Sequence, residues 1–279
     1  VLAYFLGVAA RLLTSGLASP EALYTALSIY LLFAIGFKGG VELSHTPLAV
    51  VLLPALLTLA LGLFRPFPAY LLARRFLKVG REDAAALAAH YGSVSAVTFL
   101  AALTFVQAVG DAAPGFMPTL VALLEVPGIV VALLLGKRRE GRLLSGEEGM
   151  KKVEAFFVEP FQGALTLFLL DLGMVAASRL SVLRQVGLRL VLFGVGLALF
   201  HGALGVYLGL LAGLGVGGAA VLGAMAASAS YIAAPAAVRI ALPEANPSLY
   251  LTASLAVTFP FNLVLGIPLY RALAVLWGG

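Results

Sequence analysis

Residues 90–98 read HYGSVSAVT and residues 227–235 read ASASYIAAP, and each stretch lies near the middle of a long apolar segment. Both stretches contain two serines separated by one residue. Side chains at i and i+2 point about 200° apart on an α-helix, so two such serines can serve one site only where the helix breaks. Gly92 and Pro235 are residue types that permit a break. The two stretches therefore predict a pair of broken helices.

A broken helix can bind an anion, because it exposes backbone N–H groups and the positive end of its dipole. Serine hydroxyls can donate further hydrogen bonds to the same anion. Small residues also allow close helix packing, which is the favoured explanation of either stretch alone. The occurrence of both stretches in one chain favours an anion site. The residues that we expect to bind the anion are Gly92, Ser93, Ser95, Ser228 and Ser230.

The two stretches belong to a wider internal similarity, at a separation close to half the chain length of 279 residues. Three short motifs of the first half recur in register in the second: IGF at 35–37 as LGM at 172–174, SVS at 93–95 as SAS at 228–230, and VP at 126–127 as FP at 259–260. Three pairs in register indicate two diverged copies of one unit.

The composition places these copies in a membrane. Hydrophobic residues make up 62% of the chain, charged residues 11%, and the mean hydropathy is +1.06, whereas soluble domains carry about 25% charged residues. Short strands of alternating polarity, as in a β-barrel, are not visible. The net charge of +5 comes from basic residues between apolar segments, which argues against nucleic-acid binding. We expect an all-α integral membrane protein.

Nine apolar stretches are interpreted as membrane spans: 1–17, 21–37, 47–73, 83–109, 115–136, 157–178, 186–212, 217–238 and 248–276. Loops rich in Arg and Lys mark the cytoplasmic side. The basic clusters at 74–81 and 137–139 are separated by two spans, which places both on that side and the N-terminus outside. Only one span separates residue 139 from the third cluster at 179–189, so that cluster would face outward.

A tenth span, missing between about residues 137 and 147, removes this conflict. Each half then has five spans. Because five is an odd number, the second half enters the membrane from the opposite side, as in the inverted repeats of many secondary transporters. The expected organisation is a first inverted repeat at 1–136, a cytoplasmic linker with the remnant of a sixth span at 137–156, and a second inverted repeat at 157–279.

Polar residues at membrane depth are functional candidates by default. Glu125 and Asp171 could each bind a cation or a proton, or could form a structural ion pair. Thr98 and Asn262 could help to bind a coupling cation, although polar helix packing explains such residues too. The histidines lack ligand-spaced partners, and no HExxH or GxSxG motif occurs, so we expect no metal site, no cofactor and no enzyme.

At these motifs the chain resembles the sodium-dependent bicarbonate transporter family known from cyanobacteria, and especially its bacterial permease-like members. The matching stretches are LLFAIGFKGGVEL (31–43), HYGSVSAVTFLAALT (90–104), EVPGIVVAL (125–133) and AASASYIAAPAAVRIALPEANPSLYLTAS (226–254). The resemblance implies a homotrimer of ten-span subunits in the bacterial inner membrane and a bicarbonate site between two broken helices. It also implies Na⁺ as the coupling ion and a cytoplasmic PII-like regulatory partner.

Carried over by position, residues 92–95 match the first substrate-binding turn of the family and residues 228–230 match the second. The chain departs from the family where residues 228–235 read SASYIAAP instead of SSSDISGP, and where Ala96 and Val97 replace Gly and Ser. These changes remove oxygen ligands that a sodium ion prefers. Three readings stay open: sodium-coupled bicarbonate uptake, cation- or proton-coupled transport of another small anion such as a short carboxylate, and a receptor that transports nothing.

Overall fold

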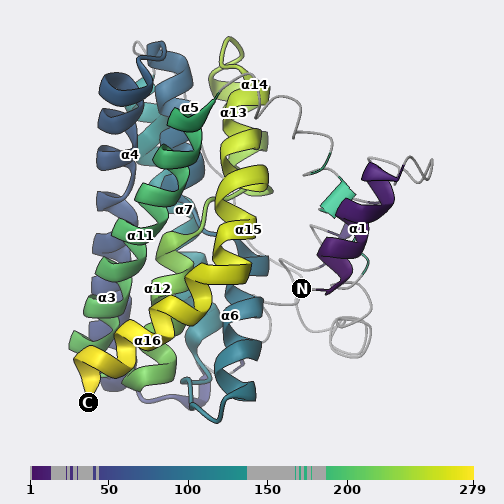
Figure 1. Cartoon of the computed structure of the whole chain (residues 1–279). Helices are drawn as coiled ribbons and strands as arrows, with labels where there is room; N and C mark the ends of the chain where they lie inside the picture. The colour runs from purple at the N-terminus through teal and green to yellow at the C-terminus, as the bar shows by residue number, and fades with distance from the viewer. Residues whose placement is uncertain are drawn as a thin grey trace.

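The computed structural model describes residues 2–13, 44–136 and 187–279, and positions 23, 26, 27, 30, 40, 41, 167, 170, 173, 174 and 177. The regular elements of this part are helices (Figure 1). They are α1 (Leu2–Leu12), α3 (Leu48–Phe64), α4 (Pro66–Leu72), η1 (Ala73–Leu77), α5 (Arg81–Gly92), α6 (Ala96–Ala108), α7 (Met117–Gly136), α11 (Leu188–Leu211), α12 (Gly215–Ala227), α13 (Ala233–Ala241), α14 (Pro247–Leu251), η3 (Thr252–Thr258), α15 (Phe259–Phe261), η4 (Asn262–Gly266) and α16 (Ile267–Gly278).

Several of these helices join into segments that can cross a bilayer, which needs about 20 apolar residues. Within the described residues five segments are long and apolar enough, namely Leu48–Leu77, Arg81–Ala108, Met117–Gly136, Leu188–Leu211 and Pro247–Gly278. They agree with the expected spans to within a few residues, so the prediction of an all-α membrane protein is confirmed. The complete set of ten spans stays a prediction, and the expected linker at 137–156 lies outside the described residues.

The described parts of the two halves contain the same order of elements. A long span (α3 to η1, or α11) is followed by a broken helix (α5 and α6, or α12 and α13) and then by another span (α7, or α14 to α16). Figure 1 shows α5 and α13 toward one end of the bundle and α6 and α12 toward the other, in agreement with the contacts within each pair. The two broken helices therefore run in opposite directions, as an inverted repeat requires.

Glycines let the broken helix of the second half pack closely against α11. A Cβ at Gly205 would lie 2.8 Å from the carbonyl oxygen of Leu222, and a Cβ at Gly209 would lie 2.7 Å from Cα of Ala219. Only hydrogen fits at these positions, which is typical of membrane helices that associate through small residues. As a result α12 is buried along nearly its whole length, and its C-terminal end reaches the interior of the bundle.

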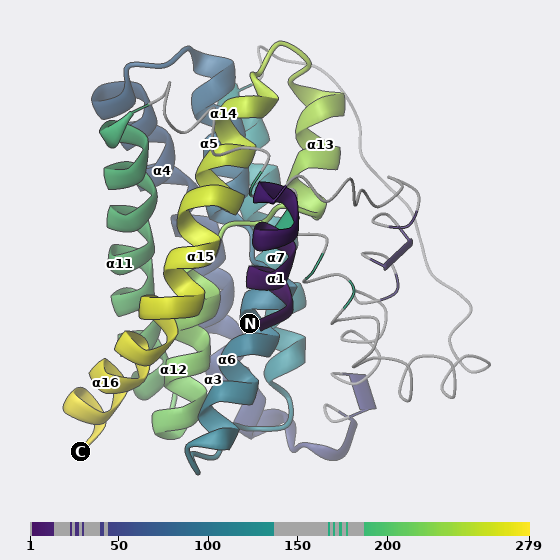
Figure 2. The same cartoon turned by 45° about the vertical axis from the view of Figure 1, so that its right-hand side comes forward.

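The N-terminal helix α1 packs on the last span through one aromatic side chain. The hydroxyl of Tyr4 donates to the carbonyl oxygen of Leu255 at 3.3 Å, and its ring meets that of Phe259 edge to face at 5.0 Å. Figure 2 shows α1 beside the segment that contains α15. A Cβ at Gly7 would overlap the carbonyl oxygen of Leu170, and a Cβ at Gly173 would overlap the carbonyl oxygen of Tyr4, so neither position has room for a side chain.

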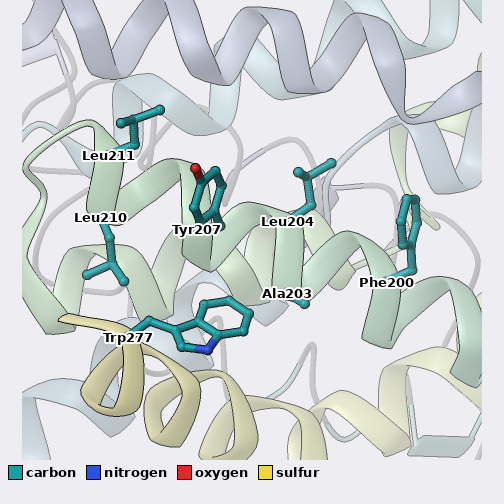
Figure 3. A pocket seen from close by; sticks show the side chains of 7 residues that line it. All are labelled: Phe200, Ala203, Leu204, Tyr207, Leu210, Leu211 and Trp277. Carbon is teal, nitrogen blue, oxygen red and sulfur yellow. The ribbon is translucent and has the colours of Figure 1, made fainter. Parts of the chain in front are cut away.

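A groove of about 720 Å³ lies on the outer side of α11, near α16 (Figure 3). Phe200, Tyr207 and Trp277 line it together with aliphatic side chains, and about half of each of these aromatic side chains is exposed. This apolar, outward-facing lining suits contact with the acyl chains of lipids. None of the lining residues belongs to either break.

Candidate functional site

Both predicted helix breaks are present. In the first half α5 ends at Gly92, and Ser93 and Ser95 have extended backbones with φ near −99° and −97° before α6 begins at Ala96. In the second half α12 ends at Ala227, and Ser228 is extended with φ −78° and ψ 157° before α13 begins at Ala233. The local reason is that Gly and Ser disfavour a helix interior, where Ser competes for backbone hydrogen bonds.

The two breaks cross and bond directly to each other. The backbone N–H of Ser95 donates to Oγ of Ser228 at 2.8 Å, and the backbone N–H of Ser230 donates to the carbonyl oxygen of His90 at 2.8 Å. The four expected serines are all buried, with at most 2% of each exposed. The two stretches therefore face each other, and we call residues 90–98 and 227–235 together the crossing.

Three of the expected serine hydroxyls already have partners within the crossing. Oγ of Ser95 accepts from the backbone N–H of Thr98 at 3.1 Å and donates to the hydroxyl of Tyr231 at 2.8 Å. Oγ of Ser230 accepts from the backbone N–H of Ala234 at 3.3 Å, and Oγ of Ser228 donates to the carbonyl oxygen of Met225 at 2.7 Å. These hydroxyls cap the half-helices in this conformation.

Two other hydroxyls of the first half are buried and have no hydrogen-bond partner. They are Oγ of Ser93 and Oγ1 of Thr98, with 0% and 1% of the residue exposed. A buried polar atom without a partner costs about 1–3 kcal/mol, so such atoms usually meet water or a ligand. Ser93 and Thr98 therefore each have a hydroxyl that is free to receive a bound ion, and Nε2 of His90 is likewise buried in the crossing without a hydrogen-bond partner.

Replacing Ser95 by alanine is expected to lower the free energy of unfolding by about 1 kcal/mol, the usual cost of losing a helix cap. Thermal unfolding in lipid nanodiscs measures the change. Ser93→Ala is the matched control, since it removes a hydroxyl from the same break without removing a hydrogen bond. Equal stability of the Ser95→Ala and Ser93→Ala proteins would contradict the capping role of Ser95.

The electrostatics of the crossing come from four helix ends and one buried charge. The N-terminal ends of α6 and α13, which carry partial positive charge, meet there with the C-terminal ends of α5 and α12, which carry partial negative charge. Arg65, at the joint between α3 and α4, is 0% exposed and reaches the same place. The crossing can therefore accommodate an anion at the two N-terminal ends and a cation at the two C-terminal ends.

Arg65 binds the backbone of both breaks at once. Its guanidinium group donates to the carbonyl oxygens of Ser93 at 3.0 Å and Ser228 at 2.6 Å, and more weakly to that of Gly92 at 3.5 Å. The sequence interpretation missed this residue, although an arginine inside the apolar stretch 47–73 is a signal of its own. The stretch contains one charged residue among more than twenty apolar or small ones.

The span α7 touches the crossing through two glycines. A Cβ at Gly92 would lie 2.6 Å from Cγ of Pro66 and 3.1 Å from the carbonyl oxygen of Gly128. A Cβ at Gly128 would overlap the carbonyl group of Gly92. Glu125, one turn earlier on α7, is partly buried and forms no ion pair with any residue that the structure describes.

The remaining candidates for cation binding have different surroundings. Nδ2 of Asn262 donates to the carbonyl oxygen of Ala227 at 3.1 Å, and its Oδ1 accepts from the hydroxyl of Tyr270 at 3.1 Å, so Asn262 holds the end of α12. Asp171 lies outside the described residues. Within the described ranges no three His, Asp or Glu side chains gather in a group that could hold a metal ion.

A comparison with models of known protein families gives a match. The model of a family described as the Na⁺-dependent bicarbonate transporter superfamily matches residues 1–143 and 141–275. The two matched ranges together span nearly the whole chain and meet close to the division expected from the internal similarity. No curated protein matches the sequence.

Proposed function

Because this chain belongs to the Na⁺-dependent bicarbonate transporter superfamily, we propose that it carries bicarbonate, or a carboxylate of similar size, across the membrane by secondary active transport. Membership in a transporter family agrees with the expectation that the chain is not an enzyme. The observation that carries the proposal is the crossing of two antiparallel broken helices, whose N-terminal ends meet in the interior of the bundle. This is where transporters with such repeats bind anionic substrates.

The size and burial of the crossing support a small substrate. Its serines are at most 2% exposed, and the two breaks are in hydrogen-bond contact. An anion in such a place needs most of its lone pairs filled by donors, which the hydroxyl of Ser93 and the N-terminal N–H groups of α6 and α13 that do not already donate to Ser95 or Ser230 can supply. This close packing favours a small anion over a bulky one.

Two coupling ions are compatible with the residues at hand. The family description suggests Na⁺, for which Oγ1 of Thr98 is a free oxygen ligand. Glu125 favours protons instead, since it is partly buried in the middle of α7 without an ion-pair partner among the described residues. The homotrimer, the PII-like partner, the bacterial inner membrane and the outward N-terminus belong to the same proposal and rest on the resemblance.

Uptake of labelled bicarbonate, formate and acetate into proteoliposomes tests the function. We expect bicarbonate to accumulate only in liposomes that contain the protein, and accumulation to respond to an inward Na⁺ or H⁺ gradient. The gradient that drives uptake identifies the coupling ion. Binding of an anion without any uptake would indicate the receptor alternative, and neither binding nor uptake of the three anions would contradict the proposal.

A further inference from the structure

Arg65 is a full positive charge in the interior of the bundle. No part of the residue is exposed, and no carboxylate lies within ion-pair distance among the residues that the structure describes. A buried charge without an opposite charge is costly, and proteins rarely retain one unless it is paired or functional. Its Nε also lacks a hydrogen-bond partner. The guanidinium group therefore lacks an opposite charge, and its Nε–H donor lacks an acceptor.

The partners of Arg65 are the kind of ligand that a mobile cation would use. They are carbonyl oxygens at the unwound C-terminal ends of α5 and α12, the places where transporters built from broken helices coordinate Na⁺. The two strong contacts, to Ser93 and Ser228, come from opposite halves of the chain. Arg65 thus joins the two breaks as a bound ion would, but through a side chain that cannot leave.

The position of the guanidinium is fixed by the fold. Arg65 lies between α3 and α4, and the next residue, Pro66, packs on Gly92 at the end of α5. Oγ of Ser93, which has no partner, belongs to the same residue whose carbonyl oxygen binds Arg65. An anion that accepts from this hydroxyl is therefore close to the positive charge.

We propose that Arg65 is a tethered cation that takes the place of a mobile cation between the two breaks and supplies the positive charge for the bound anion. This role presupposes the anion transport proposed above and makes it more specific. Anion binding at the crossing then needs no Na⁺, whichever ion couples transport. The same residue could instead serve only to hold the breaks together, and the two roles differ in their dependence on added cations.

Anion affinity of the purified protein in nanodiscs, with choline as the only added cation, distinguishes these roles. Wild-type protein is expected to bind bicarbonate with the same affinity in choline and in Na⁺. Arg65→Ala is expected to weaken binding in choline about ten- to a hundredfold, the usual effect of losing a charged hydrogen-bonding partner. Added Na⁺ or methylguanidinium is expected to restore most of this loss, because either ion can occupy the vacated carbonyl oxygens.

Arg65→Lys keeps the charge and covers the case in which Arg65→Ala does not fold; it is expected to bind the anion in choline more tightly than any uncharged variant. Arg239→Ala, which removes an exposed arginine of α13, is the matched control and should behave as wild type. A Na⁺ requirement in the wild type would overturn the tethered-cation role, and so would a loss in Arg65→Ala that neither cation restores. Failure of the wild type to bind any anion in either salt would instead overturn the proposed function itself.

Discussion

Replacing Gly128 by alanine is expected to abolish transport, because the added methyl group has nowhere to go. Its Cβ would overlap the carbonyl carbon and oxygen of Gly92, which are backbone atoms at the first break. Overpacking a tight interior usually costs about 1–3 kcal/mol, and a clash with backbone rather than with a flexible side chain should reach the upper end of this range or exceed it. Relief requires α7 to move away from α5, which changes the distances within the crossing.

Uptake in proteoliposomes and thermal unfolding in nanodiscs measure the two consequences for Gly128→Ala. The matched control is Gly196→Ala in α11, where a Cβ would meet nothing within 4 Å. Alanine is the better helix former by about 1 kcal/mol, so this control should be neutral or slightly stabilising. Normal uptake by the Gly128→Ala protein would show that the contact between α5 and α7 is looser than described.

Replacing Ser93 by alanine is expected to weaken anion binding about ten- to a hundredfold without lowering the stability of the empty protein. The hydroxyl of Ser93 is fully buried and has no hydrogen-bond partner, so its removal costs the folded state nothing and relieves an unsatisfied polar atom. An anion at the crossing would lose a donor to a charged group. A loss of anion affinity without a loss of stability is what we expect for a residue that binds the anion.

Titration of bicarbonate onto the purified proteins measures affinity, and thermal unfolding without added anion measures stability. Ser95→Ala provides the contrast, since the hydroxyl of Ser95 caps α6 and its loss should lower stability. Unchanged affinity in the Ser93→Ala protein would remove the hydroxyl of Ser93 from the anion site. A lowered unfolding temperature in Ser93→Ala would instead assign it a structural partner.

The broken helices could be predicted because their cause is local. Gly92 precedes two serines in the first half, and two serines precede Pro235 in the second, so the disruption of the helix follows from residues within one turn. The pairing of the breaks also had a sequence signal, in the spacing of the two motifs. The sequence pattern does not predict the hydrogen-bond partner of each hydroxyl, because the bond between Ser95 and Ser228 joins residues 133 positions apart.

By itself the sequence determined the class of the protein and the place of its breaks. In a bilayer, the backbone of an apolar stretch long enough to span can form hydrogen bonds only within its own helix. Small polar residues inside such a stretch interrupt that helix. The tertiary structure alone decided which serines cap helix ends, which hydroxyls stay free and that Arg65 reaches both breaks. Gly92 and Ser93 lie 27 and 28 residues from Arg65, and Ser228 lies 163 residues away. Contacts at such separations depend on how whole helices pack, because side-chain periodicity describes only the face of a single helix.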